Sequence, residues 1–258
     1  MSTHRLEAIP ALTDNYIWLL ADESGRAVLV DPGEAAPALQ ALRDRSLELV
    51  AILLTHHHYD HIDGTAELRT AFPAAEVIAG HDPRFGDVDR RVAEGDRVEI
   101  GGTAFVFDVV DVPGHTLSHL AYHGHGLLFC GDTLFSAGCG RLFEGTPTQM
   151  LASLDRLAAL PGETKVCCGH EYTLVNLAFA QRIEPGNDII KRRYDEVRQL
   201  RAAKQPSLPS TMSCEWACNP FLRVDESAVI AAVNGEGQSR SERFAELRRR
   251  KDDFKVPN

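Results

Sequence analysis

The chain has 258 residues, of which 44% are hydrophobic, and a formal net charge of −10 at pH 7. This length accommodates one large domain or a main domain with a smaller one, and the composition is that of a globular protein. The acidic balance argues against a nucleic-acid partner, because neutralising phosphates requires a surplus of Lys and Arg. No apolar run approaches the roughly 20 residues that cross a bilayer, so no membrane partner is expected.

The compartment follows from the N-terminal segment and the cysteines. Residues 1–5 are polar and lack the charged-then-apolar order of a secretory signal. The six cysteines include no CxxC pair, and a zinc site on Cys214 and Cys218 would need two more ligands that the nearby sequence does not offer. We therefore expect reduced structural thiols and a cytoplasmic location.

The first two thirds of the chain are predicted to form strands with a few helices between them. Apolar runs at 16–21 and 27–30 lie on either side of Gly25, which is typical of a hairpin. The uninterrupted apolar run 49–54 indicates a strand buried on both faces. Further hairpins are predicted over 98–110 and from 120–122 to 127–130, a further strand over 165–168, and helices over 62–72 and 147–160, the last capped by Thr146.

From about residue 173 the pattern becomes helical. Helices are predicted over 174–182, 188–203, 226–233 and 242–253. Asn187 and Asp225 are candidate caps, and Ser239 with Glu242 fits a capping box. A loop rich in Pro and Ser, 205–220, divides the helices into two pairs. The sequence therefore predicts an α/β domain over 1–172 and a small helical domain over 173–258.

A cluster of metal-binding residue types follows the predicted buried strand. It contains His56, His58, Asp60 and His61. Imidazole nitrogens and carboxylate oxygens are ligands for zinc, iron or manganese. Burying such groups together at a strand end is costly unless something coordinates them. His57 lies between ligands and is expected to point away from them.

Three later apolar runs also end in a ligand residue beside a glycine. His115 follows Gly114, Asp132 follows Gly131, and His170 follows Gly169. This repetition is what a site at one edge of a sheet would produce, since glycine lets the backbone approach a crowded site closely. Asp31, at the end of another strand, either orients a ligand histidine or is a turn residue before Pro32.

These motifs, taken together, resemble those of the metallo-β-lactamase superfamily. The matching segments are Thr55-His56-His57-His58-Tyr59-Asp60-His61, Pro113-Gly114-His115-Thr116, Gly131-Asp132-Thr133 and Gly169-His170-Glu171-Tyr172. The resemblance implies an α/β fold, an αββα sandwich with the metals at one edge. Within the superfamily the whole chain is similar to the glyoxalase II (hydroxyacylglutathione hydrolase) family, in which a small C-terminal all-α domain binds glutathione.

The resemblance implies a ligand set for two divalent metal ions, expected to be zinc, with iron or manganese as alternatives. His56, His58 and His115 would hold the first ion; Asp60, His61 and His170 would hold the second. Asp132 would bridge them, and Asp60 and Asp132 would act in catalysis together with a shared hydroxide. Paired ions of this kind lie roughly 3.5–4 Å apart.

The resemblance also implies a substrate. It would be S-D-lactoylglutathione, hydrolysed to glutathione and D-lactate in the second step of methylglyoxal detoxification. The implied substrate-binding residues are Arg141, Phe143, Tyr172, Arg248 and Lys251. Arg248 and Lys251 are three apart and share a helical face, and this cationic face could capture a carboxylate that a chain of charge −10 would otherwise repel.

Other functions stay open at this point. A lactonase or another thioesterase of the same superfamily would share the metal residues, as would a glutathione persulfide dioxygenase with one iron. A non-catalytic scaffold is disfavoured because all seven ligand positions are filled. His119 is either a packing residue or a hydrogen-bond donor behind the ligands. The oligomeric state is left open by the sequence, with a monomer as the expectation.

Overall fold

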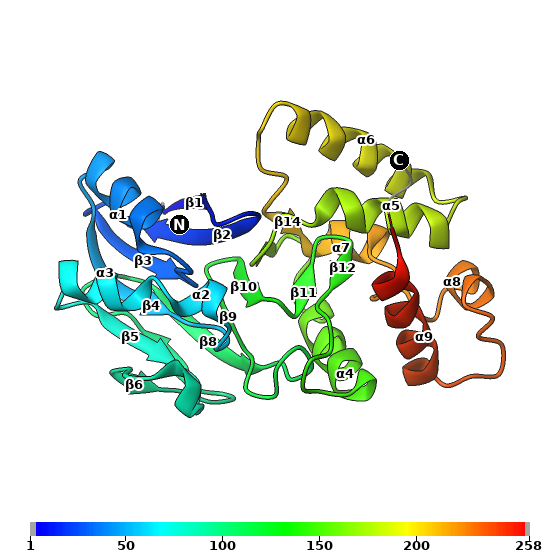
Figure 1. Cartoon of the computed structure of the whole chain (residues 1–258), viewed down its shortest axis with the longest axis horizontal. Helices are drawn as coiled ribbons and strands as arrows, with labels where there is room; N and C mark the ends of the chain where they lie inside the picture. The colour runs from blue at the N-terminus through cyan, green and yellow to red at the C-terminus, as the bar shows by residue number, and fades with distance from the viewer. Residues whose placement is uncertain (1–3, 256–258) are drawn as a thin grey trace. The chain divides into compact units, whose positions relative to one another are not determined.

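The structure is a computed structural model that describes residues 4–255. The first three residues of the polar segment 1–5 and the last three of the predicted helical domain lie outside this range. Internal contacts divide the chain into two compact units (Figure 1). Unit 1 comprises the described residues up to Asp111 together with Ser118–Gly131, and unit 2 comprises Val112–Leu117 together with the described residues from Asp132 onward.

Unit 1 contains a six-stranded sheet whose strands follow the chain order from β1 to β6. The strands are β1 (Arg5–Ala11), β2 (Asn15–Ala21), β3 (Arg26–Val30), β4 (Glu48–Leu53), β5 (Glu76–Ala79) and β6 (Arg90–Arg91). β1 to β3 pair antiparallel, and β3 to β6 pair parallel. Helices α1 (Ala35–Asp44) and α3 (Thr65–Ala71) pack on this sheet, because their buried residues belong to the same apolar core.

A second set of strands in unit 1 is antiparallel throughout. It runs in the order β7 (Arg97–Glu99), β8 (Val106–Asp111), β9 (Leu120–Gly124) and β10 (Leu127–Gly131). The fully buried Tyr122 on β9 donates its hydroxyl to the carbonyl of Leu54, 3.0 Å away, beyond the end of β4. The two sets of strands in unit 1 are thus joined near the segment that carries the histidine cluster.

The predicted hairpins and the buried strand of unit 1 are confirmed. β2 pairs with β3, β7 with β8, and β9 with β10, and β4 is buried along most of its length. The single helix predicted over 62–72 is wrong, because the chain forms α2 (Tyr59–Ile62) and then α3. Gly64 separates them where the backbone approaches α1, since a Cβ at Gly64 would lie 2.5 Å from the carbonyl carbon of Glu34.

Unit 2 is mainly helical. Its strands are β11 (Leu134–Phe135), β12 (Gly138–Cys139), β13 (Lys165–Cys168) and β14 (Ser210–Thr211), of which β11 pairs with β12 and β13 with β14. Its helices are α4 (Pro147–Ala158), α5 (Thr173–Ile183), α6 (Asp188–Ala202), α7 (Met212–Cys218), α8 (Ser227–Ala232) and α9 (Arg240–Asp253). Buried residues of α5, α6 and α7 form one apolar cluster.

Most predicted helix starts in unit 2 are confirmed. Thr146 and Ser239 form capping boxes, and Asn187 accepts hydrogen bonds from the first turn of α6. Two details of the prediction are wrong. The expected loop 205–220 contains α7, capped by Thr211, and the N-cap position of α8 is Glu226 rather than Asp225. Asp225 is instead paired with Arg240 and Arg243, which satisfy its carboxylate away from the helix start.

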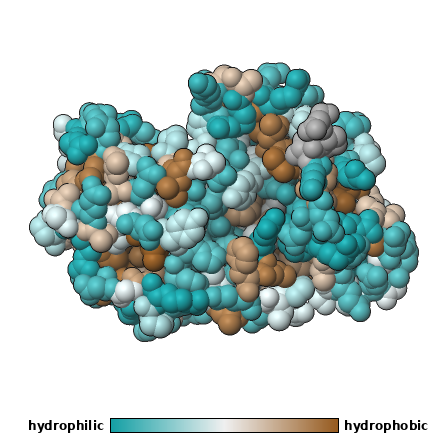
Figure 2. Space-filling view, viewed as in Figure 1, coloured by the Kyte–Doolittle hydropathy of each residue, from teal (hydrophilic) through white to brown (hydrophobic). Residues whose placement is uncertain are grey.

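On the face drawn in Figure 2, hydrophilic side chains predominate and hydrophobic ones lie in separate small groups. Tyr59, Leu117 and Phe143 are among the large hydrophobic side chains that are exposed. Between residues 4 and 255 no helix combines the length and the apolar character needed to cross a membrane.

Candidate functional site

The histidine cluster of unit 1 is placed by two parallel strands. β3 and β4 are parallel neighbours, so Asp31 and Thr55, which follow them, lie at the same edge of the sheet. The carboxylate of Asp31 accepts hydrogen bonds from the Thr55 amide at 2.8 Å and from the Thr55 hydroxyl at 2.6 Å. This fixes the backbone from which the histidine loop departs.

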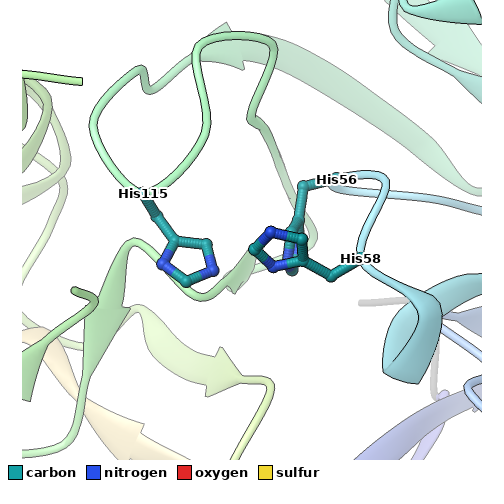
Figure 3. A group of neighbouring side chains, drawn as sticks. All are labelled: His56, His58 and His115. Carbon is teal, nitrogen blue, oxygen red and sulfur yellow. The ribbon is translucent and has the colours of Figure 1, made fainter. Parts of the chain in front are cut away.

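His56 and His58 point their ring nitrogens toward one another. His56 Nε2 lies 3.1 Å from His58 Nδ1, and Figure 3 shows the two rings edge to face. His56 is fully buried, and its other face stacks on the ring of His119 at 4.5 Å. The two nitrogens are close enough to bind one ion.

Asp60 and His61 lie on the single turn of α2. Asp60 Oδ2 is 3.6 Å from His61 Nε2. The amide of Asn15, at the start of β2, donates to Asp60 Oδ2 at 3.0 Å and to the Asp60 carbonyl at 3.1 Å. Gly33 permits this packing, since a Cβ there would lie 1.9 Å from the Asp60 carbonyl oxygen. Asn15 therefore holds the carboxylate of Asp60, and the close approach of Gly33 holds its backbone.

Asp31 contacts a predicted ligand histidine, as one of the two interpretations of the sequence expects. Its Oδ2 lies 3.1 Å from His61 Nδ1, and both side chains are buried. A proton on Nδ1 then points at the carboxylate, so Nε2 is the nitrogen that can act as a ligand. Asp31, His56 and His61 offer ligand atoms that all lie within 4.8 Å of one another.

Unit 2 brings together the other three predicted ligands. Asp132 Oδ2 lies 3.5 Å from His115 Nε2 and 3.3 Å from His170 Nε2. His115, on the loop shown in Figure 3, has its Nδ1 2.9 Å from the carbonyl of Arg141, so its Nε2 is the nitrogen that can act as a ligand. Gly140, which follows β12, lets its own backbone pass beside Asp132, since a Cβ there would lie 1.9 Å from the Asp132 carbonyl oxygen. One carboxylate oxygen thus lies between two imidazole nitrogens.

Both donor sets fit divalent metal ions. Unit 1 presents imidazole nitrogens and the Asp60 carboxylate, and unit 2 presents two imidazoles around one carboxylate. Nitrogen and carboxylate oxygen donors without thiolates are accepted by zinc, iron and manganese. The carboxylate between two histidines in unit 2 has the arrangement that a shared ligand requires.

Two predicted substrate residues in unit 2 are aromatic side chains beside its ligands. Tyr172 stacks on the ring of His170, with centroids 4.8 Å apart and planes 4° apart. Phe143 meets the ring of His115 edge to face at 5.2 Å. Both side chains remain accessible to solvent, with Phe143 64% exposed and Tyr172 36% exposed. They form apolar surface next to the donors of unit 2.

The three predicted cationic contacts differ in their surroundings. Arg248 is buried and donates to the Cys139 carbonyl at 2.7 Å and to Asp252 at 3.0 Å. Arg141 is exposed, with its Nε 3.5 Å from Asp252 Oδ1. Burial and the neighbouring Arg248 lower the pKa of Lys251 to about 8. Arg248 therefore supports the loop that carries Arg141, whereas Arg141 is the accessible cation.

Several further side chains near the ligands have structural surroundings. His57 faces Asp82, with Nδ1 3.8 Å from Oδ2, which agrees with the expectation that it points away. His119 directs its Nδ1 to the Leu120 carbonyl at 3.0 Å and stacks on the ring of His56, which agrees with a packing role. Burial raises the pKa of Cys139 to about 11, which disfavours its reactive thiolate form.

Asn15 and Asp82 are the residues near the donors of unit 1 that sequence reasoning did not identify. Asp82 accepts a 2.6 Å hydrogen bond from Ser118 and is paired with Arg84. Both residues are distant in sequence from the histidine loop. Asn15 follows a turn in which Leu12 adopts a φ of 50°, and no motif in the neighbouring sequence marks it as a partner of Asp60.

Comparison with known proteins decides the family. A sequence model described as the metallo-beta-lactamase superfamily matches residues 12–170, and one described as hydroxyacylglutathione hydrolase C-terminus matches residues 171–254. A hydroxyacylglutathione hydrolase of Xanthomonas campestris pv. campestris is 53% identical over 256 residues, 98% of this chain and 100% of that protein. The hydroxyacylglutathione hydrolase of Aliivibrio salmonicida is 50% identical, over 96% of this chain and 99% of its own. The chain belongs to the hydroxyacylglutathione hydrolase family of the metallo-β-lactamase superfamily.

Solved structures agree on the fold. A B3 metallo-beta-lactamase, BLEG-1, aligns with a TM-score of 0.64 at 25% identity, over 85% of this chain and 99% of its own. ETHE1 from Myxococcus xanthus aligns with a TM-score of 0.66 at 24% identity, over 99% of this chain and 92% of its own. The predicted metallo-β-lactamase fold with a C-terminal helical region is confirmed, as is the predicted family.

Proposed function

We propose that this chain is a thioester hydrolase acting on S-(2-hydroxyacyl)glutathione, with S-D-lactoylglutathione as its substrate in the second step of methylglyoxal detoxification. The observation that carries the proposal is the full-length likeness to hydroxyacylglutathione hydrolases, which includes the C-terminal region at 171–254. In the reaction, water adds its oxygen to the thioester carbonyl carbon and the carbon–sulfur bond breaks. Glutathione leaves through its sulfur, and a 2-hydroxy acid remains.

The seven donors are proposed to form one binuclear centre. His56, His58 and His115 would hold one divalent ion, Asp60, His61 and His170 the other, and Asp132 both. Zinc is the proposed metal, with iron or manganese as alternatives. When bound, such ions lower the pKa of a water molecule and stabilise negative charge on the substrate carbonyl oxygen.

The chain's own residues prepare the donors for that role. Asp31 accepts a hydrogen bond from His61 Nδ1, and the Arg141 carbonyl accepts one from His115 Nδ1. In each ring, Nε2 would then be the ligand atom. Asn15 holds Asp60 in one orientation. Ligands that are fixed before metal and substrate arrive need not be ordered during binding, and this favours both affinity and rate.

Glutathione is proposed to bind against unit 2. Its carboxylates would be met by the accessible guanidinium of Arg141 and by the ammonium of Lys251, with Arg248 adding positive charge from beneath. Phe143 and Tyr172 would pack against the apolar parts of the substrate beside His115 and His170. In this proposal residues 1–172 form the catalytic domain and 173–258 the glutathione-binding domain.

The setting of the enzyme is also a proposal. A cytoplasmic location is supported by six free cysteines, five of which are buried. We propose a monomer that has no nucleic-acid or membrane partner, which fits the net charge of −10.

The test is hydrolysis of S-D-lactoylglutathione by the purified protein, followed as loss of the thioester, together with elemental analysis. We expect turnover at two metal ions per chain and loss of turnover after removal of the metal by a chelator. Faster hydrolysis of lactones than of glutathione thioesters would instead indicate a lactonase. Oxygen uptake with glutathione persulfide and no thioester turnover would indicate a dioxygenase.

A further inference from the structure

The short hairpin β11–β12 has a strained turn. Phe135 pairs with Gly138, so Ser136 and Ala137 form the turn between the strands. Ala137 has a φ of 54°, in the left-handed region that an L-residue with a Cβ occupies only at a cost. A conformation of this kind persists when surrounding groups hold it, and it is frequent at functional sites.

Glu215 on α7 is the group that holds this turn. Its side chain is fully buried, and Oε2 accepts a 2.7 Å hydrogen bond from the amide of Ala137. The hydroxyl of Ser210 donates to Oε1 at 2.5 Å, and the amide of Asn219 donates to Oε2 at 3.1 Å. Burial raises the pKa of Glu215, while these donors oppose the rise by stabilising the carboxylate.

Two asparagine side chains donate further hydrogen bonds to the hairpin backbone. Asn219 Nδ2 lies 3.1 Å from the Phe135 carbonyl and 2.9 Å from the Gly138 carbonyl. Asn176 on α5 donates to the Ser136 carbonyl at 3.0 Å. The turn thus bonds to buried side chains of two helices, and Glu215 is the charged member of that set.

Along the chain, the hairpin lies between Asp132, one of the proposed metal ligands of unit 2, and Arg141, a proposed glutathione contact. Asp132 precedes β11 by two residues, and Cys139 ends β12. The Cys139 carbonyl accepts from Arg248, and the carbonyl of Arg141, two residues on, accepts from His115. A shift of the hairpin would therefore move a metal ligand and a substrate contact together.

We propose that Glu215 is a positioning residue for the thioester hydrolysis. By holding Ala137 in its left-handed conformation, it fixes the position of the segment from Asp132 to Arg141, which carries a proposed metal ligand and a proposed substrate contact. This inference rests on the proposed function for its substrate, but its effect on metal binding does not depend on which substrate is turned over.

The deciding variant is Glu215→Leu, which has a similar volume and no acceptor oxygens. We expect metal affinity and kcat/KM for S-D-lactoylglutathione each to fall by about 10- to 100-fold, the usual effect of removing a group that orients ligands. Glu215→Gln keeps one acceptor oxygen for the Ala137 amide, and we expect it to recover most of the loss. Hydrogen exchange at the Ala137 amide is expected to quicken in the leucine variant.

A second substitution separates positioning from general stability. Glycine adopts a φ of 54° without the cost of a Cβ. Ala137→Gly in the Glu215→Leu chain is therefore expected to raise metal affinity about 5- to 30-fold above that of Glu215→Leu alone. If Glu215→Leu does not fold, Glu215→Asp, which is one methylene shorter, takes its place with the same rescue expected.

Glu184 provides the matched control. It is another buried carboxylate of unit 2, and it is paired with Arg223 at 2.8 and 2.9 Å. Glu184→Leu is expected to lower the unfolding temperature while metal affinity and KM stay at their wild-type values. Wild-type metal affinity in Glu215→Leu, no rescue by Ala137→Gly, or the same losses in Glu184→Leu would each overturn the proposal. A wild-type chain inactive on the thioester would overturn the proposed function alone, since the metal-affinity measurements still decide about Glu215.

Discussion

The two units hold their candidate metal-binding residues in different ways. In unit 1, His56, His58, Asp60 and His61 come from one segment that follows β4, and two of them are oriented by other side chains. Asp31 accepts from His61, and Asn15 donates to Asp60.

In unit 2 the three donors come from separate segments, and the backbone supplies part of the support. The Arg141 carbonyl orients His115, and the β11–β12 hairpin follows Asp132 directly. The contrast indicates that a single substitution at Asp31 or Asn15 can directly remove a hydrogen bond that orients a donor of unit 1. In unit 2 the backbone contacts beside His115 and Asp132 can be changed through buried groups that fix that backbone.

The largest effect is expected from Asp132→Ala, which removes the carboxylate between His115 and His170. We expect kcat/KM for S-D-lactoylglutathione to fall by on the order of 100- to 1,000-fold and the metal content to drop below two ions per chain. Elemental analysis and the thioester assay measure both. Asp155→Ala, which removes a surface partner of Arg240 in the same unit, is the control and is expected to change neither. Metal content and rate near wild type in Asp132→Ala would contradict a shared ligand.

Asp31→Asn tests the side-chain support of unit 1. The amide is a weaker acceptor for the proton on His61 Nδ1, so the histidine loses part of its orientation. We expect a loss of about 10- to 100-fold in affinity for one of the two metal ions, measured by titration of the metal-free protein.

Asp22→Asn is the matched control for this prediction, because Asp22 accepts hydrogen bonds within a surface turn of the same unit. Equal metal affinities in the Asp31→Asn and Asp22→Asn variants would contradict the inference that side-chain hydrogen bonds orient the donors of unit 1.

The donor residues could be predicted from the sequence because each stands beside a glycine or at the end of an apolar run. His56 to His61, His115, Asp132 and His170 all have that local signature. The groups behind them have none. Asn15, Asp82 and Glu215 reach their partners across long stretches of chain, and nothing in a neighbouring residue marks Glu215 as the partner of Ala137.

Helix boundaries show the same limit of local signals. Thr146, Asn187 and Ser239 were predicted as caps because a cap and its helix are adjacent in sequence. The break at Gly64 was not predicted, because its cause is the close approach of the backbone at Glu34. The segment rich in Pro and Ser does not predict α7, because that helix depends on apolar residues that pack against the distant α5 and α6.

Lys251 extends the comparison to the proposed substrate side of unit 2. Its pKa is lowered to about 8, first by burial and then by Arg248, so its positive charge is present below that pH and is lost above it. We expect KM for a glutathione thioester to rise by about 5-fold as the pH increases through 8, because the complex loses one partly exposed ion pair between Lys251 and a substrate carboxylate.

Lys251→Met is expected to start from the higher KM and to show no rise over the same pH interval. Lys191→Met, which removes an exposed lysine of α6 paired with Asp188, is expected to keep the wild-type profile. A rise of equal size in the Lys251→Met chain would assign the titration to another group.

The smallest effect concerns how the helices themselves are held. None of α1, α2 and α3 in unit 1 has a side-chain hydrogen bond at its N-cap, whereas α4, α6, α7 and α9 in unit 2 do. Helices α1, α2 and α3 therefore depend on packing, whereas α4, α6, α7 and α9 depend also on their caps. Ser239→Ala removes the cap of α9, the helix that carries Arg248 and Lys251, and is expected to lower the free energy of unfolding by about 1 kcal/mol.

Chemical denaturation measures this change, and Ser227→Ala, at the first helical position of α8, is the control because that position is not a cap. Metal affinity is expected to stay at its wild-type value in both variants, since the hairpin, and not the start of α9, is proposed to hold the Asp132 segment. A loss of metal affinity in Ser239→Ala would mean that the cap of α9 and the Asp132 segment are coupled, and that the support of unit 2 extends further into its helices than the contacts of Glu215.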